Sequence, residues 1–362
     1  MKILKVKTKS PYYITISNGL LEQIPEEIAR KFEFGKIALI TDARVKELYG
    51  EALLKALKKA GLRVELFYFP EGENSKRIET VIYLAKEMLK NSFDRKDLIV
   101  ALGGGVVGDV AGFLASIYLR GIPFIQIPTT LLAQVDSSIG GKTGVDLPEG
   151  KNLIGTFYQP KAVYIDTDVL RSLPHEEIKN GLAEVVKYGC ILKRRLFSYL
   201  YKRAPFLFNV EARDYEYIIY QSCLTKATIV QKDEKETGIR RVLNFGHTIG
   251  HALESISGYR VPHGLAVAVG MAVEAKLSEL LKVNEEPLFD PLVQLLSKLE
   301  LPFRISQLNL DFEPKQLLSI IAKDKKVWKG KLTIVLLRRI GKFCLYENPP
   351  ENKILEALKQ SL

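Results

Sequence analysis

The first 170 residues alternate runs of β-branched and aliphatic residues with amphipathic segments. Helical periodicity extends over residues 44–60 and from a cap at Asn74 or Ser75 through Leu89. Short apolar runs that end in turn residues predict buried strands at residues 36–42, 63–69, 98–104, 122–128 and 161–166. Strands that alternate with helices predict an α/β domain built on a mostly parallel sheet with right-handed crossovers.

From about Leu170 the pattern becomes almost entirely helical. Two β-branched runs, 331–340 and 341–347, predict a late strand pair before a last helix. Helical periodicity covers residues 175–189, 215–231, 243–257, 265–281 and 291–299. We therefore expect two domains, 1–170 and 171–362, the second mostly α-helical, with the active site in the cleft between them.

A glycine-rich turn connects the strand at 98–104 to the apolar helix that follows it. Gly103, Gly105 and Gly108 match G-x-G-x-x-G in the strand-to-helix context of a dinucleotide site, where backbone N–H groups bind a pyrophosphate. The usual acidic residue about 20 positions later is missing, so Asp42, at the end of an earlier strand, is the candidate for the ribose. A purely structural turn, and a helix cap at Asp42, are the simpler alternatives. The pattern favours a non-standard dinucleotide site.

A second glycine segment, Gly140 to Thr143, resembles the end of a P-loop. Gln134 and Asp136 occupy the stretch where the first glycine and the spacer of that motif belong, which excludes a P-loop nucleotide triphosphatase. The segment still offers backbone donors and Lys142 to a phosphoester or a ribose.

Three of the four histidines, His247, His251 and His263, fall within 17 residues. His247 and His251 lie one helical turn apart on the same face, a frequent zinc arrangement. The third ligand could be His263 or a carboxylate such as Glu184, which lies on an apolar helix three residues before Lys187. Such residues are often core groups paired with a neighbour, but the cluster favours a metal. Spacing alone does not decide between the pairs His247/His251 and His247/His263.

The composition indicates which kinds of binding partner and cellular location to expect. The chain has 53 Lys+Arg against 42 Asp+Glu, a net charge of +11, and the lysines are spread along helices beside glutamates. No RNA- or DNA-binding motif accompanies them, so we expect no nucleic-acid partner. No apolar run approaches the roughly 20 residues of a membrane span, and the start lacks a signal-peptide core. The three cysteines are far apart and imply no disulfide framework. We expect a cytoplasmic protein.

Taken in order, these motifs are similar to those of the 3-dehydroquinate synthase family over nearly the whole chain. The matching segments are Glu71–Lys76, Gly104–Asp109, Leu119–Gly121, Pro128–Thr130, Gln134–Gly144, Gly150–Asn152, Gly181–Lys187, Arg240–His251, His263–Gly264 and Asp324–Lys326. The resemblance implies an N-terminal Rossmann-like NAD-binding domain, a C-terminal helical metal-binding domain and a homodimer.

The resemblance also implies roles for individual residues. Zn²⁺ (or Co²⁺) would be bound by Glu184, His247 and His263. His251 then becomes a catalytic residue, together with Lys142, Asn152 and Arg240. NAD would contact Asp42, Glu71, Lys76, Gly105, Val106, Val107, Gly108, Asp109, Thr129, Thr130, Lys142 and Lys151. The phosphorylated sugar-acid substrate would contact Arg120, Asp136, Lys142, Asn152, Lys187, Lys226, Arg240, Asn244 and one lysine of the pair Lys325/Lys326, with Lys325 as our candidate.

The implied activity is a lyase reaction of the shikimate pathway, toward chorismate and the aromatic amino acids. It converts 3-deoxy-D-arabino-heptulosonate 7-phosphate to 3-dehydroquinate and phosphate. NAD⁺ transiently oxidises the C5 hydroxyl, phosphate is eliminated, the hydride returns, the ring opens and an internal aldol addition closes the carbocycle.

Two alternatives remain within related chemistry. Another sugar phosphate cyclase would act on a substrate without the carboxylate. A metal-dependent polyol dehydrogenase of the glycerol dehydrogenase type would release NADH. Its substrate has no phosphate, so Lys142, Lys187, Arg240 and the pair Lys325/Lys326 would have no ligand to bind.

Overall fold

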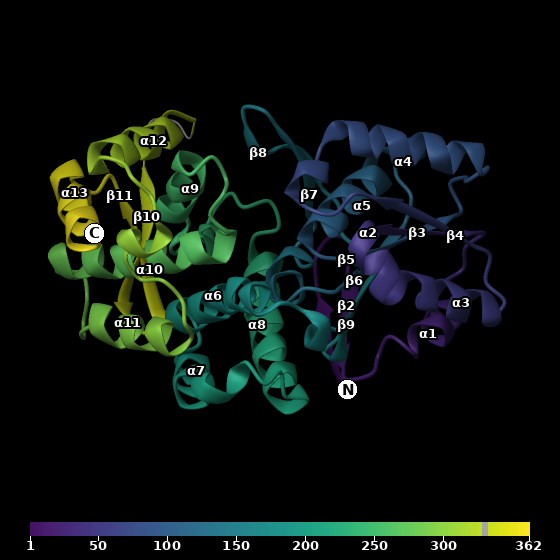
Figure 1. Cartoon of the computed structure of the whole chain (residues 1–362), viewed down its shortest axis with the longest axis horizontal. Helices are drawn as coiled ribbons and strands as arrows, with labels where there is room; N and C mark the ends of the chain where they lie inside the picture. Colours follow the sequence, from purple (N-terminus) through teal and green to yellow (C-terminus); the bar gives the residue numbers. More distant parts are fainter. Residues whose placement is uncertain (328–331) are drawn as a thin grey trace. The chain divides into compact units, whose positions relative to one another are not determined.

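The computed structural model describes residues 1–327 and 332–362, and side chains other than those of residues 322–331 (Figure 1). The chain divides into two compact units. Unit 1 consists of residues 1–173 and 215–235, and unit 2 of residues 174–214 and 236–362. The first break falls three residues after the expected boundary at 170, and unit 1 also contains a helical segment that the sequence analysis assigns to the second domain.

Unit 1 is built on a seven-stranded sheet in the order β1-β2-β9-β6-β5-β3-β4. Its strands are β1 (Lys2–Val6), β2 (Tyr12–Ser17), β3 (Ile37–Asp42), β4 (Val64–Phe69), β5 (Leu98–Gly103), β6 (Phe124–Pro128) and β9 (Ala162–Asp166). β1 and β2 pair antiparallel, and all other neighbours pair parallel. The five predicted strands and the mostly parallel sheet are confirmed, whereas the strands β1 and β2 were not predicted.

Both faces of this sheet are buried, as the nearly continuous apolar runs require. In β3, Ala38 and Ile40 pack on one face, and Ile37 and Leu39 pack on the other. The first face is covered by α4 and α5 and the second by α1 and α3 (Figure 1). The helices of unit 1 are α1 (Ile24–Lys31), α2 (Ala43–Val45), α3 (Glu51–Lys59), α4 (Ile78–Lys90), α5 (Gly105–Ile117) and most of α8 (Ala212–Lys232).

Two helix predictions in unit 1 need qualification. The helix expected over residues 44–60 is present, but Lys46–Gly50 forms a π-helical turn within it. The cap expected at Asn74 or Ser75 is wrong, because Glu73–Ser75 forms a separate 3₁₀ turn and α4 is capped by Arg77.

A hairpin of β7 (Lys142–Leu147) and β8 (Gly150–Phe157) forms a separate two-stranded sheet in unit 1. Sequence analysis did not predict it, because the glycines of this segment indicate a loop and alternating burial is weak in β8. The hairpin contains Lys142, Lys151 and Asn152, three of the candidate site residues.

Unit 2 is mostly helical and contains the expected antiparallel strand pair, β10 (Thr333–Arg339) with β11 (Lys342–Glu347). Its helices are α6 (His175–Ile191), α7 (Arg194–Leu207), α9 (His247–Ile256), α10 (His263–Leu280), α11 (Phe289–Lys298), α12 (Pro314–Val327) and α13 (Glu351–Gln360). The helix expected from residue 243 begins only at His247, because Ile239–Asn244 forms a 3₁₀ turn and Gly246 adopts φ +81°. Its core unites α9, α10, α12, α13 and β10.

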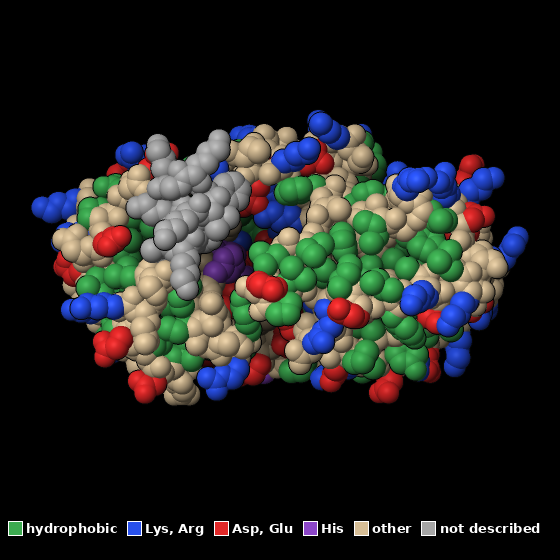
Figure 2. All heavy atoms as spheres, turned by 90° about the horizontal axis from the view of Figure 1, so that it is seen from above, with side chains coloured by type: hydrophobic (Ala, Val, Ile, Leu, Met, Phe, Trp, Pro, Cys, Tyr) green, Lys and Arg blue, Asp and Glu red, His purple; other side chains and the backbone are tan. Residues whose placement is uncertain are grey.

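Neither unit contains a helix long and apolar enough to cross a membrane, within the residues that the structure describes. On the face shown in Figure 2, described Lys and Arg side chains are interspersed with Asp and Glu.

Helices α9 and α10 of unit 2 approach each other backbone to backbone. A Cβ atom added at Gly270 on α10 would lie 2.0 Å from the carbonyl oxygen of Gly246 and 3.0 Å from the amide nitrogen of Gly250. Only glycine at position 270 permits this separation, because no flexible side chain is available to move away.

We expect Gly270→Ala to lower the free energy of unfolding by about 1–3 kcal/mol, since α9 and α10 must separate to accommodate the methyl group. Thermal unfolding followed by circular dichroism measures the effect. Gly50→Ala is the matched control: Gly50 has φ −62° and a Cβ there would make ordinary contacts of 3.6 Å, so alanine should stabilise by about 0.5–1 kcal/mol. Equal melting temperatures for Gly270→Ala and the parent protein would contradict this account of the helix contact.

Candidate metal centre and cofactor site

Three potential metal ligands converge in unit 2 from three helices. Glu184 lies in the middle of α6, whereas His247 and His263 are the first residues of α9 and α10. The Oε1 atom of Glu184 lies 3.4 Å from His247 Nε2 and 3.5 Å from His263 Nε2. A tetrahedral ion with bonds of about 2.0–2.1 Å separates its ligand atoms by about 3.3–3.4 Å. The distances to Glu184 therefore fit a metal ion of zinc-like size.

The other ring nitrogen of each histidine has a partner that orients the imidazole. His247 Nδ1 lies 3.1 Å from the carbonyl oxygen of Phe245, and His263 Nδ1 lies 3.2 Å from Oε2 of Glu254. Such contacts fix the ring orientation and the tautomer of metal-binding histidines. They leave both Nε2 atoms directed to Glu184.

The charges around these donors favour a cation. Glu184 is fully buried and forms an ion pair with Lys187 one turn along α6. Burial, reinforced by the Lys187 charge, holds the pKa of His247 well below its usual value, so this imidazole is neutral, as a ligand must be. Burial opposes protonation of His263 as well, but hydrogen bonds to Glu184 and Glu254 outweigh it and raise the pKa of His263 to about 10. Two carboxylates thus attract positive charge to this position.

The structure brings His247 and His263, rather than His247 and His251, to Glu184. The exposed His251 ring lies beside them, with its centre 5.2 Å from that of His247 and 6.0 Å from that of His263. Helical spacing alone left this choice open, because His263 belongs to a different helix.

The candidate NAD residues gather at the carboxyl edge of the unit 1 sheet. Asp42 ends β3, and the glycine turn follows β5. Glu71 follows β4, and Thr129 follows β6. In the sheet β5 lies between β3 and β6. The chain runs outward from β3 to β4 in one direction and from β5 to β6 in the opposite direction, so the strand order reverses between β3 and β5. Ligands of open α/β sheets bind at such a reversal of strand order.

The glycine turn brings α5 close to the sheet. A Cβ atom at Gly103 would lie 2.5 Å from Val107, and one at Gly108 would lie 2.8 Å from Oε1 of Gln126. The capping residue Gly104 provides no side-chain acceptor for the first turn of α5, where backbone N–H groups are suited to bind a pyrophosphate. Asp42 accepts a hydrogen bond of 2.8 Å from the Val45 amide, so its capping role is present.

Lys76 connects α5, the helix after the glycine turn, to the β7–β8 hairpin. Its buried Nζ lies 2.6 Å from Asp109 Oδ2 and donates a 2.6 Å hydrogen bond to Asn152 Oδ1. The Asn152 amide, at φ +57°, donates to Asp146 Oδ1 at 2.7 Å. Asp146 was not among the candidate residues, although an acidic residue two positions after Gly144 could have indicated a hydrogen-bond acceptor at this site. Lys151 lies 3.4 Å from Glu73 in the same region.

A second ion pair in unit 1 joins two candidate substrate residues. Lys226 on α8 places Nζ 2.8 Å from Asp136 Oδ1 and donates a 2.9 Å hydrogen bond to the Asp136 carbonyl. Asp136 lies in a π-helical turn, Ala133–Ser137, a conformation common at functional sites. This pair is one of several contacts of α8 within unit 1, beside the hydrogen bond from Cys223 to the Gln134 carbonyl.

The remaining candidates for substrate binding lie in both units. In unit 2, Arg240 is buried in the 3₁₀ turn and Asn244 donates a 3.2 Å hydrogen bond to Glu236. In unit 1, Arg120 and Lys142 are exposed. The side chains of Lys325 and Lys326 lie outside the described residues.

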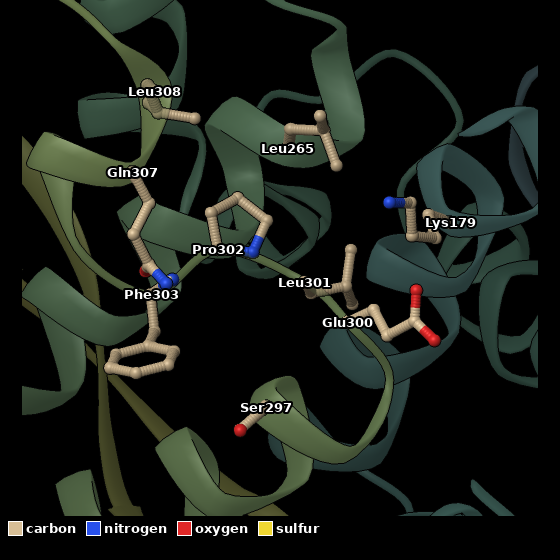
Figure 3. A pocket seen from close by; sticks show the side chains of 9 residues that line it. All are labelled: Lys179, Leu265, Ser297, Glu300, Leu301, Pro302, Phe303, Gln307 and Leu308. Carbon is tan, nitrogen blue, oxygen red and sulfur yellow. The ribbon is translucent and has the colours of Figure 1, made fainter. Parts of the chain in front are cut away.

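Figure 3 shows a cavity of about 320 Å³ in unit 2. Lys179 of α6 and Leu265 of α10 face it, together with residues of the segment that follows α11. None of the candidate site residues whose side chains the structure describes lines this cavity, Glu184, His247 and His263 included.

Comparison with solved structures shows which proteins have a similar fold. A 2-deoxy-scyllo-inosose synthase, solved in complex with carbaglucose-6-phosphate, NAD⁺ and Co²⁺, is 28% identical, with a TM-score of 0.90 and coverage of 100% of both chains. An iron-containing alcohol dehydrogenase from Thermococcus thioreducens has a TM-score of 0.69 over 97% of this chain and 98% of its own, at 16% identity. This second likeness shows the fold alone. The protein thus falls in a fold class shared by such synthases and dehydrogenases.

Sequence comparison identifies the family within this class. Residues 66–180 match the model of the 3-dehydroquinate synthase N-terminal domain, and residues 181–327 match that of the C-terminal domain. A 3-dehydroquinate synthase of Desulforamulus reducens is 42% identical over 350 residues, which cover 96% of this chain and 97% of the relative. The chain belongs to the 3-dehydroquinate synthase family.

We expect Glu184→Gln and His263→Ala to abolish stoichiometric binding of Zn²⁺ or Co²⁺ while leaving the fold intact, because the first removes the anionic charge of the carboxylate donor and the second removes an imidazole donor. Metal content after dialysis, measured by mass spectrometry, checks the result. His175→Ala is the matched control, since His175 is an exposed histidine at the start of α6 outside this cluster. Full metal retention in either ligand variant would exclude that residue as a ligand.

Proposed function

We propose that the protein is a 3-dehydroquinate synthase that converts 3-deoxy-D-arabino-heptulosonate 7-phosphate to 3-dehydroquinate and phosphate. The observation that carries the proposal is the Glu184–His247–His263 donor set, with distances of 3.4 and 3.5 Å to the carboxylate, in a chain of this family. The product belongs to the shikimate pathway toward aromatic amino acids.

Residues of unit 1 would hold NAD. The first turn of α5, with residues Gly105–Asp109, presents backbone donors for the pyrophosphate, and Asp42 and Glu71 follow neighbouring strands at the same edge. Bound NAD⁺ supplies a hydride acceptor that is restored within one turnover. Thr129, Thr130, Lys76, Lys142 and Lys151 complete the proposed cofactor contacts.

Residues of unit 2 would hold the metal. Bound Zn²⁺ or Co²⁺ supplies a Lewis acid for a hydroxyl and carbonyl oxygen of the substrate. Glu184, His247 and His263 provide the ligands, and Lys187 compensates the buried Glu184 charge. His251, exposed beside the ligand rings, is our candidate to exchange a proton with a substrate hydroxyl.

The substrate carries a phosphate dianion and a carboxylate, which require cationic donors. Lys226 is held by Asp136, and Asn152 is held by Lys76, so these side chains are ordered before a ligand arrives. Preorganisation lowers the entropy cost of binding and improves orientation. Arg120, Lys142, Lys187, Arg240, Asn244 and Lys325 are the other proposed contacts.

We also propose that the protein is a cytoplasmic homodimer. NAD⁺ and phosphorylated sugars are cytoplasmic metabolites, and the cysteines Cys190, Cys223 and Cys344 are free, as is usual in a reducing compartment. Light scattering coupled to size-exclusion chromatography should give twice the chain mass of 40.8 kDa. A mass of 40.8 kDa at micromolar concentration would contradict the dimer.

We expect purified protein to release phosphate from 3-deoxy-D-arabino-heptulosonate 7-phosphate only when NAD⁺ and a divalent metal are present, without net NADH. Phosphate release and absorbance in the NADH band are followed in the same cuvette, with and without NAD⁺ and after chelator treatment. Release from glucose 6-phosphate but not from this substrate would indicate another sugar phosphate cyclase. NADH that accumulates with unphosphorylated polyols would indicate a dehydrogenase.

We expect Lys226→Met to raise the KM for the sugar phosphate by about 10–100-fold, the equivalent of one charged hydrogen bond of about 1.5–3 kcal/mol. The KM for NAD⁺ should stay within about twofold, because Lys226 is assigned to the substrate alone. Lys232→Met, at the exposed end of the same helix, is the matched control. Steady-state kinetics with each ligand varied in turn measures both constants, and equal losses for both ligands would count against the substrate role.

A further inference from the structure

Both histidine ligands occupy the first position of a helix whose own cap residue lacks a side-chain acceptor. Gly246 caps α9 and Pro262 caps α10, and neither provides a side-chain hydrogen bond. The first N–H groups of a helix have no partner within the helix and need acceptors from elsewhere. The position of His247 and His263 therefore depends on which groups satisfy these amides.

Neighbouring helices supply the acceptors. Asn180 on α6 accepts a hydrogen bond of 2.6 Å from the Gly264 amide, directly after His263. Glu274 on α10 accepts a hydrogen bond of 2.6 Å through Oε2 from the Gly246 amide, directly before His247. Each bond thus anchors the backbone one residue from a ligand.

These bonds connect the three ligand helices in series. Asn180 lies one turn before Glu184, so α6 sets the start of α10. Glu274 lies on α10, which in turn sets the start of α9. The close contacts agree with this: a Cβ atom at Gly264 would lie 2.0 Å from the Asn180 carbonyl oxygen, and one at Gly270 would lie 2.0 Å from that of Gly246.

We propose that Asn180 and Glu274 are positioning residues of the metal centre: they hold the starts of α10 and α9 so that the Nε2 atoms of His263 and His247 keep their distances from Glu184. This inference rests on the metal site of the proposed function. Neither residue touches the donor atoms of the cluster, and both act through backbone amides.

Glu274 acts as a hydrogen-bond acceptor, and its charge is not required. It is fully buried, and Oε1 has no hydrogen-bond partner among the described residues. Burial raises the pKa of Glu274 well above its usual value, against the opposing hydrogen bonds from the Gly246, Thr248 and Ile249 amides. Glutamine retains an acceptor oxygen of the same reach, so Glu274→Gln should conserve the position of α9.

In the test, Co²⁺ is titrated into protein from which metal has been removed. The affinity for Co²⁺ and the visible absorption of the bound ion are measured. We expect Glu274→Ala and Asn180→Ala to weaken Co²⁺ binding by about 10–100-fold and to alter the absorption band, because the geometry around the ion is relaxed. Glu274→Gln and Asn180→Asp keep an acceptor and should bind Co²⁺ within about threefold of the parent protein.

A structural control separates positioning from loss of stability. Leu358→Ala removes a fully buried side chain of α13 in the same core, so it should lower the melting temperature without changing Co²⁺ affinity or absorption. If Glu274→Ala does not fold, Asn180→Ala and Glu274→Gln decide the matter, since Asn180 is less deeply buried than Glu274.

The outcomes distinguish this inference from the proposed function. Parent-like Co²⁺ affinity and absorption in folded Asn180→Ala would overturn the inference while leaving the metal site intact. Equal losses in Glu274→Gln and Glu274→Ala would also overturn it, because the acceptor would then not be what matters. Absence of Co²⁺ binding by the parent protein itself would instead contradict the proposed function.

Discussion

The proposed metal centre depends on how closely three helices of unit 2 approach one another. Glycine at positions 264 and 270 allows α10 to contact the backbones of α6 and α9, and side chains on one helix accept hydrogen bonds from the first amides of the next. Because two of the proposed ligands, His247 and His263, are the first residues of their helices, a shift of either helix start would move a donor atom directly. The geometry of the donor set therefore follows from helix packing.

Burial makes this packing costly unless the charges are balanced. Glu184 and Glu254 are nearly inaccessible to solvent, and an unpaired carboxylate in such surroundings is strongly destabilising. Lys187 compensates Glu184, while His263 lies against both carboxylates. His247 faces Glu184 but stays neutral, which suits a ligand rather than a counterion. The raised pKa of His263 means that Lys187 and protonated His263 balance the two carboxylates, and a metal ion would take the place of the His263 proton.

Sequence patterns predicted elements with a clear apolar or helical period, and missed a hairpin without such a pattern and contacts between distant segments. Short apolar runs that end in turn residues located β3 and its parallel neighbours, because both faces of each strand are buried. The β7–β8 hairpin escaped detection, since its glycines have no local signature of a strand. Helical spacing placed His247 beside His251, yet His263 reaches Glu184 only through the packing of α10 on α6. A lone acid in an apolar helix indicated Glu184, and the same signal, applied to α10, would have indicated Glu274.

In unit 1 the residues proposed to contact the cofactor and those proposed to contact the substrate lie mainly on different elements. Parallel strands end at one edge and present Asp42, Glu71, the glycine turn and Thr129, all suited to a dinucleotide. Two elements outside that sheet carry Asn152 and Lys226: the β7–β8 hairpin, where Asn152 accepts a hydrogen bond from Lys76, and α8, where Lys226 forms an ion pair with Asp136. In the proposed function the cofactor contacts lie mainly at this sheet edge, whereas the substrate contacts lie on the attached elements and, at Lys187, Arg240 and Asn244, in unit 2. Selection among sugar phosphates is therefore expected from residues outside the sheet.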